Sequence, residues 1–527
     1  MREIGIILGL IFAATLLQPL ARRFDVPLPI AQVFGGILLS AIPFIPTVPV
    51  DPELAFVLFV PPLLYRAAAT SSLRDTRRDL NPILLLAVAL VLITIAAVAV
   101  TAHAIAPRIP WGAAFVLGAI VAPSDADVTT QIVRRLGLPS RVVTILEGET
   151  LLNDTTAFVA YRMAVAAAAV GSFSLASAAG SFVLKTVGGL VFGIVVGWFF
   201  RKLRPLIGDP TAVTTLSLLT PFAAYLIAEQ VQASGVLAVV AAGAVASRTP
   251  LRTTSARTRV RLNVVWDAAS FAIASLVFTL IGLQIGRLVP QFLGVDSLHL
   301  VFAVVVVSAT VVITRLLWIF SATYFPRIVR HPRRPAPRWR ALVVLGWAGL
   351  RGGDTLVMAL AIPFQTASGA PFPVRGVLVA VAFGVIMLTL LVQGFTLRPL
   401  IKRFALPRED ALAVEERRAR VEAEQAALRT LEDIGGLGNI PANALAQMRE
   451  GIAQRTRLDL DDTDHSAGHT GLTLEDSIRD AEQQVREAAR DAIVGLRDRE
   501  IIGDAAFRRV LSDLDLDEIR NVEEPII

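Results

Sequence analysis

Glu147-Gly148-Glu149-Thr150-Leu151-Leu152-Asn153-Asp154 leads directly into an apolar run that continues through Thr155 to Ala160. Glu147 and Glu149 lie at the start of the run, and the Asn153 amide and the Asp154 carboxylate lie inside it. A carboxylate near the centre of a bilayer is costly unless it meets a charge or an ion. Asp154 therefore indicates a pathway for a proton or a small cation.

The composition of the whole chain agrees with a membrane protein. Of its 527 residues, 54% are hydrophobic and 18% are charged, and the mean hydropathy is +0.63. These values favour a polytopic membrane protein with a soluble appendage. The absence of cysteine excludes disulfides, thiolate metal sites and cysteine nucleophiles. The net charge of +6 comes from basic residues in short loops, which set topology, so no nucleic-acid partner is expected.

Apolar stretches of spanning length recur almost to residue 400. The first, Ile4 to Leu20, lacks a basic leader and a cleavage motif, so we interpret it as a retained helix. The pattern predicts an all-α protein with about thirteen transmembrane helices, near 3–20, 28–48, 52–70, 81–106, 111–134, 142–168, 176–200, 211–230, 234–248, 263–286, 298–320, 340–364 and 376–397.

The connecting loops alternate in charge. Arginine-rich loops recur on one side, at 22–23, 74–78, 134–141, 201–204, 248–261 and 326–340. The opposite loops carry little more than Arg108, Arg287 and Arg375. By the positive-inside rule the first set is cytoplasmic. We therefore expect a multi-pass protein of the plasma (inner) membrane, with its N-terminus outside and its C-terminus in the cytoplasm.

The composition changes abruptly after Arg403, which predicts a transmembrane domain over 1–403 and a cytoplasmic tail over 404–527. Residues 407–432 form a charged amphipathic pattern, and 459–471 form an acidic linker. Thr473 begins a capping-box pattern that opens a further helix to about Arg497. The tail has no phosphate-binding loop, so we expect a helical regulatory segment rather than a catalytic domain.

Polar residues lie at the middle of the fifth predicted helix. Pro123 removes a backbone donor and disfavours helix at the residue before it, which predicts an unwound turn. Ser124, Asp125 and Asp127 follow immediately. Broken helices within a membrane line cavities, and their freed carbonyls can bind a cation, so these residues favour a site over a simple kink.

The sixth helix presents oxygen ligands near the same depth. Thr150 and Asp154 lie four residues apart, as do Glu149 and Asn153, so each pair shares a helix face. Carboxylate, amide and hydroxyl oxygens suit small alkali cations. Glu147 fits two interpretations equally well, an accessory group of this site or an interfacial acid that pairs with an arginine of the preceding loop.

The twelfth helix places Arg351 near the midplane, within a run that contains four glycines. A buried guanidinium stays charged and needs a carboxylate, for which Glu149 and Asp354 are the candidates. The glycines permit unwinding or close helix approach. Two interrupted segments in corresponding halves predict an inverted-repeat transporter with two crossing broken helices and its site between them.

Together these residues resemble the monovalent cation–proton antiporter family, in its sodium/proton exchanger branch. The resemblance covers the membrane region and leaves out only the tail. The matching motifs are Pro61-Pro-Leu-Leu-Tyr65, Ser124-Asp125, Glu147-Gly-Glu-Thr-Leu-Leu-Asn-Asp154, Tyr225-Leu-Ile-Ala-Glu229, Ser234-Gly-Val-Leu-Ala-Val-Val240, Ile281-Gly-Leu-Gln284 and Gly349-Leu-Arg-Gly352.

The resemblance implies a thirteen-helix fold with a dimerisation domain and a core domain, and hence a homodimer. It implies a cation site of Asp154, Asn153, Thr150, Ser124 and the backbone near Asp125. Of these, Asp154, Thr150 and Ser124 are the implied ligands of Na⁺. It further implies that Glu149 pairs with Arg351. The implied activity is electroneutral one-for-one exchange of Na⁺ for H⁺ in pH and sodium homeostasis, with no cofactor beyond the transported ions and no enzymatic reaction.

Some residues depart from the family pattern. Ala126 and Thr150 replace residues usual in the family, and Asp127 and Asp354 are additional acids. These departures leave open which of Na⁺, Li⁺ and K⁺ is transported, and they leave open the stoichiometry of the exchange. Two other classes of function remain as alternatives, an intramembrane aspartyl enzyme that uses Asp125 with Asp154, and a cation channel gated by the tail.

Overall fold

The structure is a computed structural model, and its described part is helical and contains no β-strand. It describes residues 2–24, 26, 28–42, 52–71, 80–124, 140–170, 175–247, 254–292, 297–330, 339–366, 369–404, 411–436, 442–458 and 472–523. The chain divides into two compact units, one of residues 1–250 and 264–408, the other of residues 251–263 and 409–527. The boundary falls a few residues after the start of the long helix α13 (Ala256–Phe292).

Most of the remaining helices of the first unit follow the expected spans, although the second ends at Ser40 instead of near residue 48. They are α1 (Arg2–Arg23), α2 (Leu28–Ser40), α3 (Pro52–Thr70), α5 (Leu80–Leu84), the π-helix η1 (Leu85–Ala89), α6 (Leu90–Ile105), α7 (Trp111–Val121), α9 (Ser140–Val170), α10 (Leu175–Ile207), α11 (Pro210–Gln230), α12 (Gly235–Ala246), α14 (Ser297–Arg330), α15 (Trp339–Trp347), α16 (Gly353–Leu360) and α17 (Arg375–Phe404).

Many of these helices are suited to a membrane. Among the described residues, six helices are long and apolar enough to span one, and five shorter helices are apolar. Large apolar side chains on the outer helices are exposed, such as Leu184 at 76% and Leu298 at 80%. Exposed apolar faces of this extent suit lipid rather than water. The all-helical membrane architecture is confirmed, whereas the number of thirteen spans is not.

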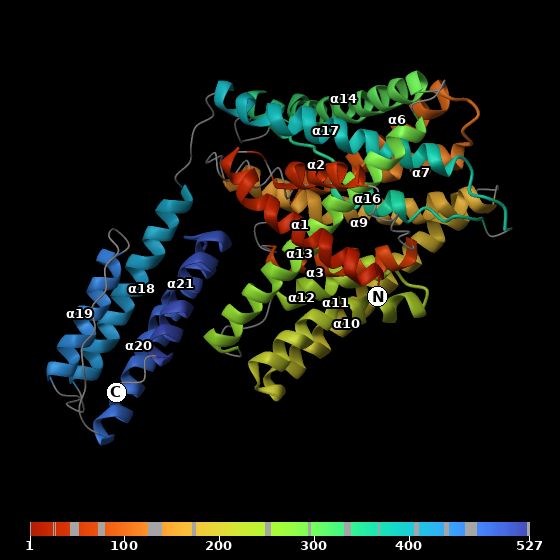
Figure 1. The fold of residues 1–527 in the computed structure, drawn as a ribbon. Coiled ribbons are helices and arrows are strands. Elements are labelled where there is room, and N and C mark those ends of the chain that lie inside the picture. The colour runs from red at the N-terminus through yellow and green to blue at the C-terminus, as the bar shows by residue number, and fades with distance from the viewer. Residues whose placement is uncertain are drawn as a thin grey trace. The chain divides into compact units, whose positions relative to one another are not determined.

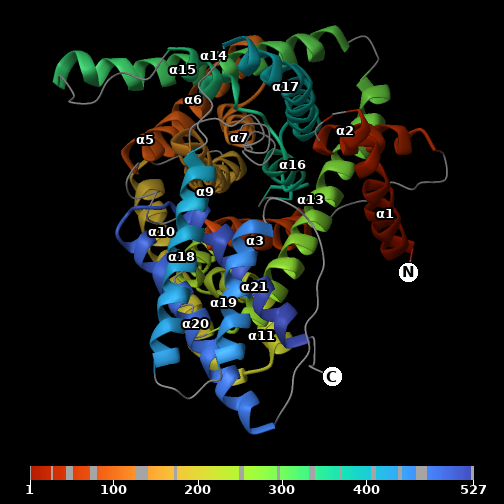
Figure 2. The same ribbon diagram turned by 90° about the vertical axis from the view of Figure 1, so that its left-hand side faces the viewer.

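Most helices of the first unit pack as two groups, to which α1, α2 and α13 are not assigned. Helices α3, α10, α11 and α12 contact one another extensively, and we call them the α10 bundle. Helices α5, α6, α7, α9 and α14–α17, with η1, form the second group, which we call the α9 bundle. Figures 1 and 2 show α14 and α17 on the side of this unit away from α10 and α11, with α7, α9 and α16 between.

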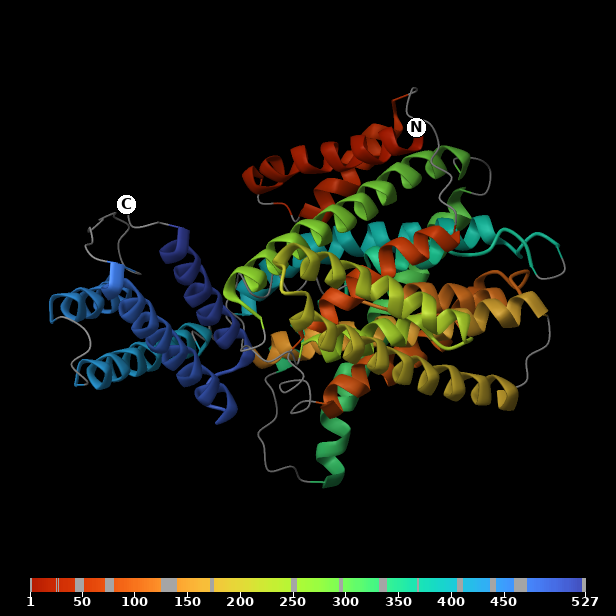
Figure 3. The same ribbon diagram turned by 90° about the horizontal axis from the view of Figure 1, so that it is seen from below.

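Helix α13 (light green in Figure 3) runs obliquely as one long rod. Its packing against α2 depends on two glycines that let the backbones touch. A Cβ on Gly282 would lie 1.9 Å from the carbonyl oxygen of Val33, and one on Gly36 would lie 2.2 Å from that of Thr279. Only glycine permits such an approach, so this contact explains both residues.

Two helices stop at the predicted interruptions. Helix α7 ends at Val121, just before Pro123. The twelfth predicted helix is divided, because α15 ends at Trp347 and α16 begins at Gly353. Proline in the first case and a glycine-rich stretch in the second remove the backbone preference for continuous helix. The prediction of broken helices is therefore confirmed for the twelfth span.

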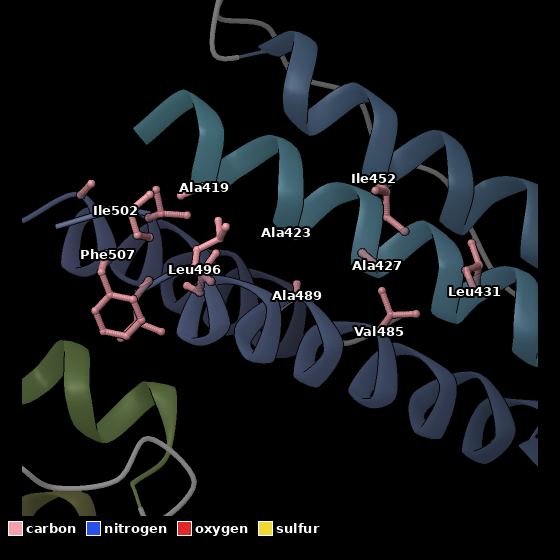
Figure 4. Close-up of a cluster of buried hydrophobic side chains, with 14 of the residues drawn as sticks. Ala419, Ala423, Ala427, Leu431, Ile452, Val485, Ala489, Leu496, Ile502 and Phe507 are labelled. Atoms are coloured by element: carbon pink, nitrogen blue, oxygen red, sulfur yellow. The ribbon is translucent and has the colours of Figure 1, made fainter. Parts of the chain in front are cut away.

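The second unit contains four tail helices, α18 (Ala411–Gly436), α19 (Ala442–Leu458), α20 (Leu472–Asp498) and α21 (Asp504–Glu523). Helices α18 and α20 correspond to the two predicted from sequence, while α19 and α21 are additional. Figure 4 shows their shared apolar core, which includes Ala427, Leu431, Val485, Ala489 and Phe507. The tail is therefore a packed helical unit with its own core.

Candidate functional site

A polar network joins the end of α7 to the middle of α9. The amide nitrogen of Asn153 donates to the Ser124 hydroxyl at 3.0 Å and to its carbonyl oxygen at 3.3 Å. Both residues are almost completely buried. The structure thus brings Ser124 and Asn153 together, as the two motifs predict.

The Ser124 contacts also determine which way the Asn153 amide faces. A backbone carbonyl can only accept a hydrogen bond, so the amide nitrogen must be the group that faces Ser124. The oxygen Oδ1 of Asn153 is then turned away, and it has no hydrogen-bond partner among the described residues. A buried acceptor of this kind is costly unless it meets a donor or a cation. Asn153 therefore offers an oxygen ligand.

Asp154 lies beside this amide, in the middle of α9, and is 3% exposed. The guanidinium of Arg351 is close enough for the charge of Asp154 to act on it. Thr150, one turn earlier and half-buried, donates its hydroxyl to the carbonyl of Leu146 at 3.1 Å, which leaves its oxygen lone pairs available. Carboxylate, amide and hydroxyl oxygens are hence gathered along α9.

Glu149 forms a buried ion pair with a residue that the sequence motifs do not predict. Its carboxylate binds the guanidinium of Arg315 in bidentate fashion, with 2.9 Å between Nη2 and Oε2. Oε1 also accepts from the Ser124 hydroxyl at 3.0 Å. The side chains of Arg315 and Glu149 are 3% and 1% exposed. The predicted partner, Arg351, is replaced by Arg315 in the structure.

The reason for this exchange of partners is visible at Gly349. A Cβ at this position would lie 2.5 Å from Cδ and 2.7 Å from Nε of Arg315, so the glycine leaves room for the arginine to enter from α14. Sequence spacing within one helix cannot reveal a partner on another helix. The available signal is a lone arginine in the apolar run of α14, where an unpaired charge is not tolerated.

Arg351 instead connects the two helix interruptions. Its Nε donates to the carbonyl of Val121 at the end of α7 at 2.6 Å, and its Nη1 donates to Gly349 at 2.7 Å. Its backbone nitrogen donates to the Thr389 hydroxyl at 3.3 Å. The guanidinium is fully buried, and the charges of Glu149 and Asp154 act on it. It therefore satisfies carbonyls that the broken helices leave without intrahelical donors.

The other predicted site residues are only partly described. Asp125 and Asp127 lie outside the described residues, as does the side chain of Glu147. Asp354 lies in the first turn of α16 and is partly buried. A carboxylate is stabilised at a helix N-terminus by the helix dipole, which is an adequate structural role for Asp354.

Comparison with known proteins assigns the membrane region to a family. Residues 8–403 match the family described as sodium/hydrogen exchanger, transmembrane. The chain is 32% identical to an uncharacterised Na⁺/H⁺ exchanger of Mycobacterium tuberculosis (strain H37Rv) over 531 residues, which cover 98% of this chain and 97% of the relative. This match includes the tail.

Two further similarities agree. A sodium, potassium, lithium and rubidium/H⁺ antiporter of Bacillus subtilis is 33% identical over 71% of this chain and 57% of its own length. The solved sodium/proton antiporter of Methanocaldococcus jannaschii shares the fold, with a TM-score of 0.58 at 16% identity, over 76% of this chain and 98% of that one. The family comprises transporters and not enzymes. The chain belongs to the sodium/hydrogen exchanger family, whose members are transmembrane cation–proton antiporters.

Proposed function

We propose that the protein exchanges Na⁺ for protons at Asp154, and that Li⁺ and K⁺ can take the place of Na⁺. The observation that carries the proposal is the buried Asp154 carboxylate beside the Asn153 amide, whose oxygen Oδ1 has no hydrogen-bond partner in the described structure. A carboxylate in such surroundings can be neutralised by a proton or by a cation, and the two compete.

The proposed ligands of the cation are oxygens. Asp154, Asn153 and Thr150 supply them from α9, and Ser124 with the backbone near Asp125 supplies them from the interruption after α7. The charges of Glu149 and Arg315 neutralise each other, so neither side chain is needed to compensate the charge of the transported ion. Among the described residues of α9, Asp154 then remains as the proposed exchangeable carboxylate, which supports one-for-one electroneutral exchange.

The division into two bundles supports transport by alternating access. The proposed ligands lie on α9 and just after the end of α7, and helices of the α10 bundle contact helices of the α9 bundle. Movement of the α9 bundle against the α10 bundle would expose Asp154 to one side of the membrane and then to the other. We further propose that the protein is a homodimer in the plasma membrane, with its N-terminus outside and its C-terminal tail in the cytoplasm as a regulatory domain.

The test is transport by the Asp154→Asn variant in everted membrane vesicles. We expect no Na⁺-driven recovery of a pH-dye signal, because the amide neither releases a proton nor carries charge. The Asp267→Asn variant is the matched control, since that carboxylate is 72% exposed and pairs with Arg66. Exchange retained by Asp154→Asn at the control's rate would overturn the assignment.

A second measurement addresses the cation and the stoichiometry. Purified protein in proteoliposomes is supplied with Na⁺, Li⁺ or K⁺, with and without an imposed membrane voltage. One-for-one exchange predicts rates that do not respond to voltage, because no net charge moves. A voltage-dependent rate would show that a second carboxylate takes part.

A further inference from the structure

A second polar cluster lies on α9 beyond Asp154. Arg162 donates to both carboxylate oxygens of Glu229, at 2.7 and 2.8 Å, and to the Tyr225 hydroxyl at 2.8 Å. Glu229 and Tyr225 are on α11. The cluster therefore connects the α9 bundle, which holds the proposed cation ligands, to the α10 bundle.

The position of Arg162 relates it to the cation site. Asp154, Phe158 and Arg162 follow one another at intervals of four, so they lie along one side of α9 on successive turns. Eight residues of helix place Arg162 about 12 Å beyond Asp154. Phe158 between them is fully buried. A route from the end of α11 to Asp154 along this side of α9 would therefore meet the ion pair first and the buried phenyl ring second.

The two halves of the ion pair are held differently. Glu229 also accepts from the backbone nitrogen of Gly235 at 3.0 Å, at the N-terminus of α12, where the helix dipole stabilises a carboxylate. Glu229 therefore stays in place on the α10 bundle when Arg162 leaves. The arginine is carried by α9, and so it moves with Asp154.

The exposure of the pair suits a contact that forms and breaks. The side chains of Arg162 and Glu229 are 43% and 30% exposed, in contrast to the almost fully buried pair of Arg315 and Glu149. Partly solvated ion pairs are individually weak, whereas breaking a buried pair is strongly unfavourable. The buried pair is suited to hold the α9 bundle together, and the half-exposed pair to be released during each cycle.

We propose that Arg162 and Glu229 form a latch that closes the route to Asp154 from the α11–α12 end, and that the pair separates in every exchange cycle. The inference rests on the proposed alternating-access exchange. By the charge pattern of the loops, this end faces the outside of the cell.

The first test uses the absence of native cysteine. Arg162→Cys and Glu229→Cys are combined and joined by a reducible bis-methanethiosulfonate reagent about as long as the original pair. We expect cross-linking to lower exchange by roughly tenfold or more, because a carrier held in one state cannot cycle, and reductant to restore it. The control is Gly188→Cys with Ala233→Cys, whose Cβ atoms would lie 3.1 Å apart within the α10 bundle. This cross-link should leave exchange unchanged.

The second test does not require transport. Ala157→Cys, buried one turn beyond Asp154, reports access to the route through its reaction with a membrane-impermeant methanethiosulfonate. Adding Arg162→Gln should speed labelling from the α11–α12 side by roughly three- to fivefold, the change expected from losing one half-exposed ion pair. Arg66→Gln, which breaks the pair with Asp267, is the control and should not change the rate.

The outcomes separate the latch from the exchange function. Full exchange by the cross-linked Arg162–Glu229 protein would overturn the latch while leaving cation–proton exchange in place. If the double-cysteine protein does not transport before cross-linking, the labelling test decides. Equal labelling rates with and without Arg162→Gln would overturn the proposal.

Discussion

At the scale of single residues, a chain of hydrogen bonds from Arg315 to Asn153 sets the chemistry of the site. Arg315 holds the Glu149 carboxylate, Glu149 accepts from Ser124, and Ser124 accepts from Asn153. Each side chain therefore fixes the next, and the last link turns Oδ1 of Asn153 away from Ser124. At the proposed cation site, the ion pair would therefore act by positioning Asn153 and not by contact with the transported ion.

The first prediction concerns the identity of the partner of Glu149. Glu149→Gln and Arg315→Met should each lower the free energy of unfolding by about 3–5 kcal/mol, because each leaves a buried charge unpaired. The double variant should lose much less than the sum. Unfolding in detergent, followed as a double-mutant cycle, measures this coupling. A stronger coupling of Glu149 to Arg351 than to Arg315 would contradict the structure.

The second prediction concerns the glycine that admits Arg315. Gly349→Ala should cost about 1–3 kcal/mol by overpacking, since the new methyl group meets a guanidinium stem that Glu149 holds in place. Gly346→Ala is the comparison, because its methyl group would meet only the end of the Leu316 side chain, at 2.5 Å, which can rotate. Thermal unfolding of the two variants, with exchange rates, should rank Gly349→Ala as the more damaging.

At the scale of elements, helix α13 connects different parts of the first unit. Trp266 stacks on Tyr65 of α3, with ring centroids 5.4 Å apart, and donates to Ser217 of α11 at 3.0 Å. Farther along, Ser275 accepts from Gln32 of α2 at 2.7 Å. One straight helix thus contacts the α10 bundle at one point and α2 at another, and its fit against α2 depends on the glycine pair described above.

The third prediction tests that fit. Gly282→Ala should lower the melting temperature of the protein, because the methyl group would lie 1.9 Å from a backbone oxygen that cannot move aside without separating the helices. Gly180→Ala, in α10, is the matched control, since nothing lies within 4 Å of its added methyl group. The control should be stabilised by about 0.5–1 kcal/mol, because alanine is the better helix former. Equal effects of the two substitutions would rule out the close contact.

At the scale of the whole molecule, the tail unit includes a segment from the middle of the chain. Arg259, in the first turn of α13, donates from Nε to Asp515 of α21 at 2.6 Å. Arg490 of α20 donates to the same carboxylate at 3.0 Å. Asp515 is 4% exposed. A buried carboxylate with two arginines therefore anchors the start of α13, at Arg259, within the second unit.

The fourth prediction measures this anchor. Asp515→Ala leaves Arg259 partly buried without its carboxylate and leaves Arg490 with Glu518 alone, so it should lower the opening free energy of α20 and α21 by about 3 kcal/mol. Asp513→Ala should cost less than about 1 kcal/mol, because its pair with Arg420 is exposed. Hydrogen exchange of the full chain, followed in peptides from these helices, measures both. Equal protection in the two variants would show that the network does not hold the unit together.

The sequence by itself determined the class of the protein and indicated which buried polar residues to propose for the site. Long apolar runs specify membrane helices because no other backbone arrangement satisfies its hydrogen bonds in lipid. The cost of burying charge draws attention to Asp154, Glu149 and Arg351. Proline and glycine at depth indicate the interruptions, since these residues alter the backbone whatever the neighbours are.

Only the tertiary structure decided which charges meet. Arg315 stands 166 residues after Glu149, and no local spacing relates the two. The same holds for Arg162 with Glu229, 67 residues apart, and for Arg259 with Asp515, 256 residues apart. Helix periodicity determines the face on which a side chain lies, but its partner depends on how distant helices pack. The resemblance to the family predicted Arg351 as the partner of Glu149. In the structure, α14 approaches closely at Gly349, and Arg315 of α14 is the partner instead.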